Sequence, residues 1–270
     1  MSSSLSSKRV FITGGSSGIG RACAAQFADA GAHVFLTARG EERLQRTIAD
    51  LRKTHPGVEI DGGVLDVRDA AAAETFIHNL PPKWQEVDVL INNAGLSRQL
   101  DPVYANTVSD IDDMIDTNVK GLLYVTRAIV PKMIARNAGH IINLGSTAGH
   151  DVYPGGTVYC ASKFAVGAIT QGLKMDLHGT EVRVSTVDPG LVETDFSNVR
   201  FHGDTERAAT VYADTIPLSA DDVAEAVIWC ASRPLRVNIH EVIMRPIYQS
   251  SSYHLQRGMD RAAWEAAQSS

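Results

Sequence analysis

Thr13-Gly14-Gly15-Ser16-Ser17-Gly18-Ile19-Gly20 is the stretch of sequence that decides the fold. It follows the β-branched run Arg9–Thr13 and leads into the alanine-rich run Gly20–Ala30, so a strand and a helix flank a glycine-rich turn. Glycines let such a turn approach a diphosphate closely, and the following helix presents free N–H groups to it. The spacing is Gly-x3-Gly-x-Gly rather than Gly-x-Gly-x2-Gly, and a plain glycine-rich turn is the alternative. We predict a dinucleotide site contacted by Thr13, Gly14, Ser16, Ser17, Gly18, Ile19 and Gly20.

Short apolar runs alternate with helical patterns along almost the whole chain, which is typical of βαβ units around a parallel sheet. The expected strands are Arg9–Thr13, His33–Thr37, Glu59–Leu65, Val87–Ile91, His140–Leu144, Arg183–Val187 and Glu241–Met244. We therefore predict a single-domain α/β fold of the Rossmann type, a doubly wound parallel sheet of about seven strands with helices on both faces.

No linker or repeat divides the chain, which we expect to form one domain with two short extensions. Residues 1–7 are expected to be a flexible, serine-rich N-terminus, residues 8–245 the Rossmann-type domain, and residues 246–270 a C-terminal tail. Residues 191–218 are the longest departure from the strand and helix alternation. Loops longer than about 12–15 residues are usually functional in compact domains, so we expect a substrate lid here.

Composition excludes several classes of protein. The 270 residues are 44% hydrophobic and 21% charged, which suits one large domain. A net charge of −6 argues against a nucleic-acid partner, and no apolar run is long enough to predict a membrane span or a signal peptide. Cys23, Cys160 and Cys230 lack metal-type spacing, so neither a disulfide framework nor a metal site is expected. We expect a cytoplasmic enzyme.

Arg39 stands at the end of the second predicted strand. A site specific for NAD usually places an acidic residue there to bind both ribose hydroxyls. A guanidinium suits instead the 2′-phosphate of NADP, through charge-assisted hydrogen bonds. The alternative is a solvated charge at a strand end, with Glu41 and Glu42 directly following. We predict NADP(H) as the cofactor.

Two further turns follow the third and fourth predicted strands and point to the same crevice. Asp66 is placed to accept a hydrogen bond from the adenine amino group, with Val67 beside it. The turn Asn92-Asn93-Ala94-Gly95 would let the backbone pass close to a ribose. Each motif alone is an ordinary turn, but together they add cofactor contacts at Asp66, Val67, Asn93, Ala94 and Gly95.

Tyr159 and Lys163 lie four residues apart in a predicted helix, and therefore on one face of it. The unperturbed pKa of tyrosine is about 10, and a neighbouring cation favours the phenolate. The pair thus suits acid/base chemistry at an oxygen atom. Taken alone, a solvated helix edge explains it as well.

The motifs together resemble the short-chain dehydrogenase/reductases, in order and spacing over residues 8–245. The resemblance is carried by the glycine turn, by Asn92-Asn-Ala-Gly95, Asn118 and Ser146, by Tyr159-x3-Lys163, and by Pro189-Gly190-x-Val192-x-Thr194. It implies an oxidoreductase in which hydride moves to or from a bound nicotinamide.

The resemblance also implies roles for particular side chains. Tyr159 would be the proton donor or acceptor, and Ser146 would orient and polarise the substrate oxygen. Lys163 would bind the ribose hydroxyls and lower the pKa of the tyrosine, while Asn118 would hold a water in the proton relay. Cofactor contacts would be completed by Pro189, Gly190, Val192 and Thr194, the last at the carboxamide.

A finer resemblance lies in Gly145–Gly149, Met175–Thr180, Leu191–Asp204 and Val237–Ile239. These segments are similar to the NADP-dependent 3-hydroxy acid dehydrogenases, a branch with serine 3-dehydrogenases and sulfoacetaldehyde reductases. The branch implies a small anionic substrate held near Tyr159 by cations or other donors. The candidates are Arg200, His150 and Tyr153, followed by His202 and Arg245.

Three alternatives stay open. Within the same family, the chain could reduce 3-oxoacyl thioesters, or general carbonyl compounds and sugars. From another class, it could be a dinucleotide-binding sensor without catalysis, although such a module does not need Ser146, Tyr159 and Lys163 as a set.

The aromatic tail, residues 247–270, could pack across a subunit interface or be disordered beyond Arg257. The family resemblance implies a homo-oligomer, a tetramer or a dimer.

Overall fold

A seven-stranded, fully parallel sheet forms the centre of the protein in the computed structural model, which describes residues 5–268. Its strand order is β3-β2-β1-β4-β5-β6-β7, so the predicted doubly wound sheet is confirmed. The strands end within a few residues of the predicted limits: β1 (Arg9–Thr13), β2 (His33–Ala38), β3 (Ile60–Val64), β4 (Val89–Asn92), β5 (Gly139–Leu144), β6 (Val182–Pro189) and β7 (Glu241–Met244).

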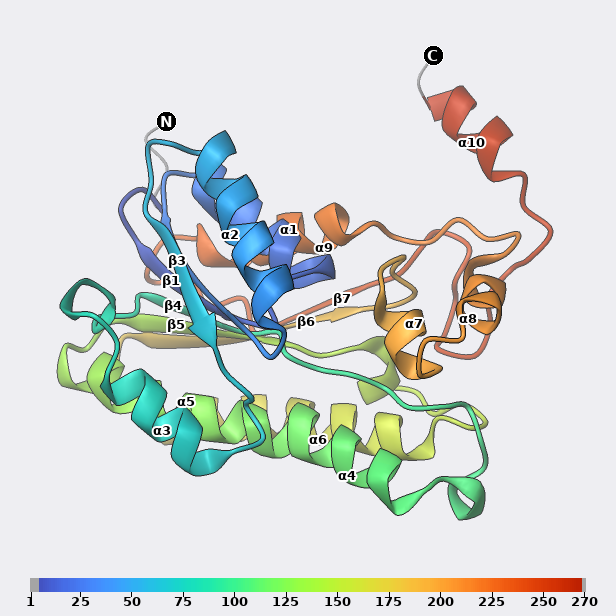
Figure 1. The fold of residues 1–270 in the computed structure, drawn as a ribbon, viewed down its shortest axis with the longest axis horizontal. Helices are drawn as coiled ribbons and strands as arrows, with labels where there is room; N and C mark the ends of the chain where they lie inside the picture. Colours follow the sequence, from blue (N-terminus) through green and yellow to red (C-terminus); the bar gives the residue numbers. More distant parts are fainter. Residues whose placement is uncertain (1–4, 269–270) are drawn as a thin grey trace.

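Helices cover both faces of the sheet (Figure 1). One face carries α1 (Gly18–Asp29), α2 (Glu41–Thr54) and α9 (Ala220–Ala231). The other carries α3 (Ala70–His78), α4 (Val108–Ile115), α5 (Leu122–Ala135) and α6 (Thr157–Asp176). Short helical turns lie at η1 (Pro82–Trp84), η2 (Val103–Ala105), η3 (Asp116–Gly121) and η4 (Thr147–Gly149).

Alternating side chains of the strands supply two separate apolar layers. In β1, Ile12 packs in the layer beneath α1 and α9, whereas Phe11 packs in the layer beneath α3 and α5. Both side chains are buried, and each such burial stabilises the fold by roughly 1.5–3 kcal/mol. The near-continuous hydrophobic runs of the sequence thus reflect a sheet buried on both faces.

The crevice for a ligand is set by the strand order. The chain moves outward from β1 to β3 and then returns to pair β4 on the other side of β1. Ile12 pairs in register with Leu36 of β2 and Ile91 of β4, so the strands end together at one edge. Ligands of open α/β sheets bind at this switch point, beyond the carboxyl ends of the strands.

The predicted lid, residues 191–218, contains two helices rather than one long loop. They are α7 (Phe196–Arg200) and α8 (Thr205–Tyr212), and the Asp204 side chain caps α8 by accepting from Arg207 N at 2.9 Å. Val192 and Leu218 form an isolated parallel bridge at the base of this segment. The lid therefore has its own local structure and a fixed base.

Both extensions differ from a simple flexible chain. Leu5 is buried and Ser7 N donates to the Gly31 carbonyl at 2.8 Å, so residues 5–7 of the expected flexible segment pack on the domain. Residues 1–4 of that segment lie outside the described residues. The tail ends in α10 (Arg261–Gln268), which stands away from the sheet (Figure 1).

We also predicted that the chain has neither a disulfide framework nor a membrane span. The three cysteines are free and buried. Within residues 5–268, every helix is too short or too polar to cross a membrane. The cytoplasmic location and the homo-oligomer stay predictions.

Candidate active site

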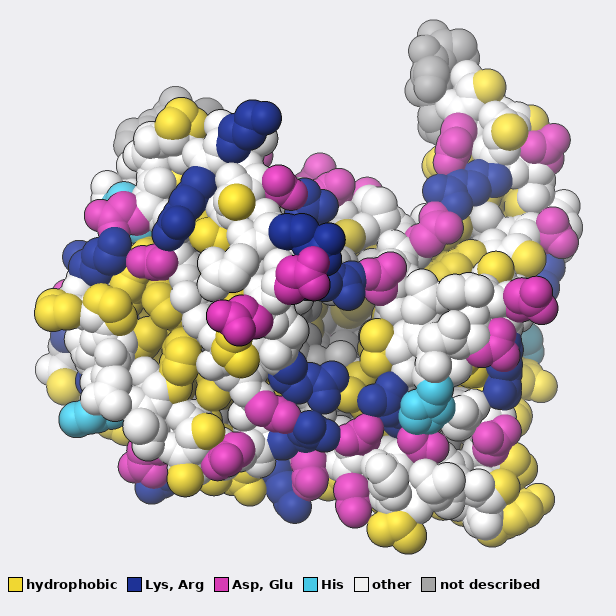
Figure 2. Space-filling model, viewed as in Figure 1, with side chains coloured by type: hydrophobic (Ala, Val, Ile, Leu, Met, Phe, Trp, Pro, Cys, Tyr) yellow, Lys and Arg dark blue, Asp and Glu magenta, His cyan; other side chains and the backbone are white. Residues whose placement is uncertain are grey.

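A cavity of about 710 Å³ lies at the switch point, between the glycine turn, the strand ends, the lid and the tail. Figure 2 shows a hollow between the body of the molecule and the lid, with basic and acidic side chains near its rim. Most predicted site residues line this cavity: Gly14, Ser16, Ser17, Gly18, Ile19, Arg39, Asp66, Val67, Asn93, Ala94, Gly95, Ser146, Tyr153, Tyr159, Lys163, Pro189, Gly190, Val192, Thr194 and Arg200.

The glycine turn is shaped to receive a diphosphate. Gly14 and Gly18 have φ angles of +65° and +50°, a backbone region that other residues seldom adopt. Ser17 precedes α1 without capping it through its side chain, and the first turn of α1 contains no acidic residue. The free N–H groups and positive dipole end of α1 therefore face the cavity, which fits a dinucleotide.

Thr13 and Gly20 do not line the cavity but hold the turn in place. The Thr13 hydroxyl accepts from Asn93 N at 3.1 Å and from Ala94 N at 3.0 Å. A side chain at Gly20 would collide with the Gly14 carbonyl and with the Asn93 amide. Both residues thus support the turn where it packs against residues 93–94, and their direct contact with the cofactor stays a prediction.

Two arginines lie where a 2′-phosphate would be expected. Arg39 follows β2 and is exposed, and Arg43 lies on the first turns of α2. Both line the cavity, and Arg43 forms an ion pair with Asp195 of the lid. Arg43 was not among the predicted cofactor contacts, since no local sequence pattern marks it as a cavity residue.

Asp66 lines the cavity beyond β3 but is already engaged by a neighbour. Arg68 donates from Nε at 3.0 Å and from Nη2 at 2.6 Å to Oδ2 of Asp66. These hydrogen bonds hold the pKa of the carboxyl below its usual range. Asp66 is therefore a fixed acceptor, suited to an amino group such as that of adenine.

Tyr159, Ser146 and Lys163 meet at the centre of the cavity. Ser146 precedes η4, where its hydroxyl accepts from Ala148 N at 3.1 Å. Lys163 Nζ donates to the Leu144 carbonyl at 2.8 Å and lies 5.9 Å from the centroid of the Tyr159 ring. Both Tyr159 and Lys163 are on α6 and buried, so the predicted helix face points into the cavity.

Burial controls the protonation of this pair. It lowers the pKa of Lys163 from 10.5 to about 8, against a smaller opposing effect of Asp188. It raises the pKa of Tyr159, while the charge of Arg200 and a hydrogen bond with Ser146 lower it. Arg200 is thus a cation that favours the phenolate; the same effect of Lys163 stays a prediction.

Asn118 lies behind the cavity wall in the π-helical turn η3. Its Oδ1 accepts from Leu96 N at 2.8 Å, and its Nδ2 donates to the Leu96 carbonyl at 2.8 Å and to Ser162 Oγ at 2.9 Å. The side chain is buried. Both Nδ2 hydrogens are used, which leaves the main chain and the second lone pair of Oδ1 for the predicted water.

Arg200 and Tyr153 lie beside the phenol, as predicted for substrate-binding residues. The guanidinium carbon of Arg200 is 5.8 Å from the centroid of the Tyr159 ring and 5.2 Å from that of Phe196. Burial raises the pKa of Tyr153, against the charge of Arg200 and a hydrogen bond with it. Within residues 5–268, Arg200 forms no ion pair with a carboxylate, and its buried Nε atom has no hydrogen-bond partner.

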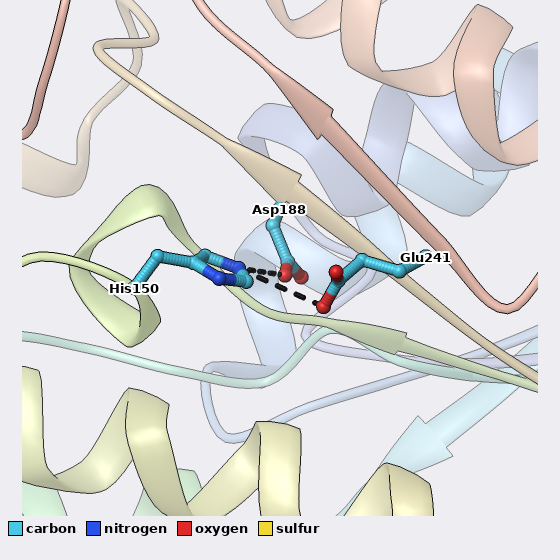
Figure 3. Close-up of side chains that lie close together, drawn as sticks. All are labelled: His150, Asp188 and Glu241. Atoms are coloured by element: carbon cyan, nitrogen blue, oxygen red, sulfur yellow. Dashed lines mark hydrogen bonds and ion pairs between the residues drawn. The ribbon is translucent and has the colours of Figure 1, made fainter.

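His150 does not line the cavity, contrary to its predicted role in substrate binding. Its Nε2 atom lies 2.5 Å from Oδ2 of buried Asp188 and 3.8 Å from Oε1 of Glu241 (Figure 3). The sequence could not show that β6 and β7 would present two carboxylates to this imidazole. The contact with Asp188 directs the imidazole towards β6 and β7.

The two weaker candidates are also engaged elsewhere. His202 Nε2 lies 3.0 Å from Asp110 Oδ1, and Arg245 Nη2 lies 3.3 Å from Asp151 Oδ2. Neither residue lines the cavity.

The tail reaches the cavity of its own chain. Gln249, Tyr253 and Leu255 line it, and Gln249 Oε1 accepts from Leu191 N at 2.8 Å. Arg257 donates from Nη1 to the carbonyls of Ala213 at 2.9 Å and Thr210 at 3.3 Å, beside α8. The aromatic content of the tail signalled docking, but not the surface on which it docks.

Comparisons with known proteins agree with this geometry. Residues 8–204 match the family model described as short chain dehydrogenase. The NADP-dependent 3-hydroxy acid dehydrogenase YdfG of Salmonella typhi is 47% identical over 242 residues, which cover 89% of this chain and 96% of that protein. Sulfoacetaldehyde reductase 2 of Chromohalobacter salexigens is 45% identical over 244 residues, 90% of this chain and 96% of that protein.

A solved structure extends the agreement to the fold. The closed form of a serine dehydrogenase complexed with NADP+ superposes with a TM-score of 0.87 at 44% identity, covering 92% of this chain and 99% of that one. The predicted resemblance to this branch is thus confirmed by sequence and by structure. The chain belongs to the short-chain dehydrogenase family.

Proposed function

We propose that the protein is an NADP(H)-dependent oxidoreductase acting on a small anionic substrate, such as a 3-hydroxy acid, a semialdehyde or sulfoacetaldehyde. Hydride would pass between the nicotinamide and the carbon that bears the hydroxyl or carbonyl oxygen. The names of the relatives support the cofactor and the substrate class. The observation that carries the proposal is the Arg200 guanidinium beside Tyr159, whose buried Nε atom has no hydrogen-bond partner within residues 5–268.

The cofactor would lie along the strand ends. The N-terminus of α1 would bind the diphosphate, and Arg39 with Arg43 would bind the 2′-phosphate. Asp66 would accept from the adenine amino group, and Thr194 would bind the carboxamide. When bound, NADPH supplies the hydride and NADP+ accepts it.

Tyr159 would manage the proton. During reduction the carbonyl carbon gains the hydride, and the electron pair of the C=O π bond moves to oxygen, which takes the phenolic proton. The oxidation reverses these steps. Ser146 would hold the same oxygen, which the interaction of its hydroxyl with the phenol supports. Asn118 would hold a relay water through its main chain or Oδ1.

Arg200 would select the substrate. An arginine whose buried Nε lacks a partner gains a hydrogen bond when a carboxylate or sulfonate enters. Its guanidinium is next to the Tyr159 ring, so the bound anion would lie a few bonds from the reacting carbon. Tyr153 would assist as a neutral donor.

The test compares anionic and neutral carbonyl compounds in an assay of NADPH consumption. Sulfoacetaldehyde, succinic semialdehyde and 3-oxo acids are matched with neutral aldehydes and ketones of similar size. We expect Arg200→Met to raise KM for the anionic compounds about ten- to a hundredfold, the loss of a charged hydrogen bond. KM for neutral compounds should change little.

Arg127→Met is the matched control, because Arg127 is an exposed arginine of α5 paired with Glu74. Its KM values for anionic and neutral compounds should equal those of the unaltered protein. If Arg200→Met leaves KM for every anionic compound unchanged, binding of the anion by Arg200 is refuted; if no anionic compound is turned over, the anionic substrate class is refuted. Turnover of neutral ketones alone would favour a general carbonyl reductase, and absence of all turnover a dinucleotide sensor.

A further inference from the structure

Arg98 joins the lid to the body of the protein. Its Nε and Nη2 atoms donate to Oδ2 of Asp113 on α4 at 3.1 and 3.0 Å. Its Nη1 atom donates to the carbonyl oxygen of Val199 in α7 at 2.5 Å. The side chain is only 12% exposed, so these interactions are little screened by water. One guanidinium thus fixes two helices to each other.

Gln99 adds a second bond to the same helix end. Its N–H donates to the carbonyl oxygen of Arg200 at 3.0 Å. Gln99 has a φ of +46°, a left-handed backbone conformation that residues other than glycine rarely adopt. The last carbonyls of a helix have no partner within the helix. Here residues 98 and 99 satisfy those of residues 199 and 200.

The contacts of Arg98 continue through Asp113 to the cofactor side of the cavity. Asp113 Oδ1 accepts from Arg68 Nη1 at 2.6 Å, and the same guanidinium holds Asp66, which lines the cavity. We call Asp66, Arg68, Asp113 and Arg98 the ion-pair chain. It runs from the wall expected to contact adenine to the helix that carries Arg200.

A network of this kind could serve stability alone. Two observations favour a role in substrate binding. The ion-pair chain ends on the main chain of α7, the helix whose last residue, Arg200, lies over Tyr159. The backbone of Gln99 adopts its rare conformation at the point where it binds that residue. Small displacements of a positioning group are costly for binding and reaction.

We propose that Arg98 is a positioning residue for substrate specificity: by holding the carboxyl end of α7, it keeps the Arg200 guanidinium over Tyr159. The inference rests on the proposed function, in which Arg200 binds the substrate anion. Arg98 itself does not line the cavity. It acts on the substrate only through α7.

The test is a double-mutant cycle with Arg98→Met, Arg200→Met and the double variant. We expect Arg98→Met to raise KM for an anionic substrate about tenfold, the loss of roughly one hydrogen bond to a charged group. The neutral substrate should keep its KM. KM of the double variant for the anionic substrate should equal that of Arg200→Met, because Arg98 then has no guanidinium at position 200 to hold in place. Additive effects would overturn the proposal.

Hydrogen exchange of residues 195–203 gives a readout that does not depend on the substrate. Arg98→Met should speed exchange there severalfold relative to Arg127→Met, because α7 loses an anchor. Arg98→Lys should restore part of the protection, since it keeps the charge but not the fork geometry. Exchange equal to that of Arg127→Met would refute the anchoring role.

Asp113→Asn provides a second variant if Arg98→Met does not fold. It keeps the side-chain volume but weakens the ion pair with Arg98, so faster exchange at residues 195–203 and a higher KM are again expected. Unchanged values would overturn the proposal. If exchange rises while KM never depends on substrate charge, the anchor stands and the anionic substrate class fails.

Discussion

The guanidinium carbon of Arg200 lies 5.8 Å from the ring centroid of Tyr159, which places a lid residue next to the phenol that is expected to move the proton. The charge of Arg200 lowers the pKa of Tyr159, opposing the larger effect of burial. If Arg200 binds the substrate anion as proposed, the lid would set both what the cavity accepts and how acidic the phenol is. A change in one property should carry a change in the other.

Removing this charge should shift the pH dependence of the reaction. In Arg200→Met the pKa of Tyr159 should rise, since the cation no longer favours the phenolate. Alcohol oxidation requires the phenolate, so its kcat/KM profile should move to higher pH. Reduction requires the protonated phenol and should persist to higher pH.

A neutral alcohol and a neutral ketone are the substrates for this measurement, because their turnover depends on the acidity of Tyr159 and not on the binding of an anion by Arg200. Arg127→Met again serves as the control. An unshifted profile in both directions would show that Arg200 does not tune the phenol.

Tyr159→Phe should abolish turnover while leaving the cofactor site intact. Loss of a positioned acid/base group costs about 10²- to 10⁴-fold in rate. Binding of NADPH, followed by its fluorescence, should stay within a factor of about three, because the glycine turn is untouched. Full activity in this variant would remove Tyr159 from the mechanism.

Arg39→Ala and Arg43→Ala should each reduce the preference for NADPH over NADH. A charged hydrogen bond to phosphate contributes about 1.5–3 kcal/mol, so we expect NADPH affinity to fall about ten- to a hundredfold. NADH affinity should change little. Arg46→Ala is the control, since Arg46 lies on α2 with Arg43, pairs with Glu42 and does not line the cavity.

Lys163→Met should alter how stability depends on alkaline pH. The pKa of Lys163 is about 8 in the folded protein and near 10.5 when unfolded, so between these values only the unfolded chain binds its proton. Below pH 8 the folded protein therefore bears the full free-energy cost of burying the charged Lys163 ammonium, and this cost disappears as the pH rises towards 10.5. The stability of the natural protein should rise relative to the variant by up to about 3 kcal/mol across this window.

Urea unfolding of both proteins between pH 7.5 and 10.5 measures this difference, since their other groups titrate alike. Lys53→Met, at an exposed position of α2, is the control. A difference that is constant with pH would show that Lys163 keeps its ordinary pKa.

Gly145→Ala should destabilise the site severely. A Cβ atom there would overlap the carboxylate of buried Asp188, whose Oδ1 is already held by Thr186. Overpacking of this kind costs typically 1–3 kcal/mol. Gly167→Ala is the matched control: it has free space on α6 and should stabilise by about 0.5–1 kcal/mol. Equal thermal midpoints would contradict the packing seen here.

The fold and the cofactor side of the cavity could be predicted from the sequence because local signals determine them. The turn at residues 13–20 needs glycines at fixed positions, and the strand ends bring Asp66 and Asn93 to the same edge once the strand order is known. Tyr159 and Lys163 share a helix face whatever surrounds them.

The substrate side depended on contacts between distant segments. His150 was predicted to meet the substrate, but Asp188 and Glu241, on two other strands, bind it instead. Arg43 and the tail enter the cavity through packing that no local pattern records. Arg200 was identified correctly as a neighbour of the phenol, yet the bonds from residues 98 and 99 that hold it there had no signal in the sequence.

The contribution of residues 249–257 to the cavity wall also orders events during biosynthesis. The glycine turn, β4 and α6 all leave the ribosome before this segment, so a growing chain could assemble its nucleotide crevice first. The cavity wall is complete only when Tyr253 and Leu255 arrive and Arg257 engages α8. Selection among substrates would then be the last property that the newly made protein acquires.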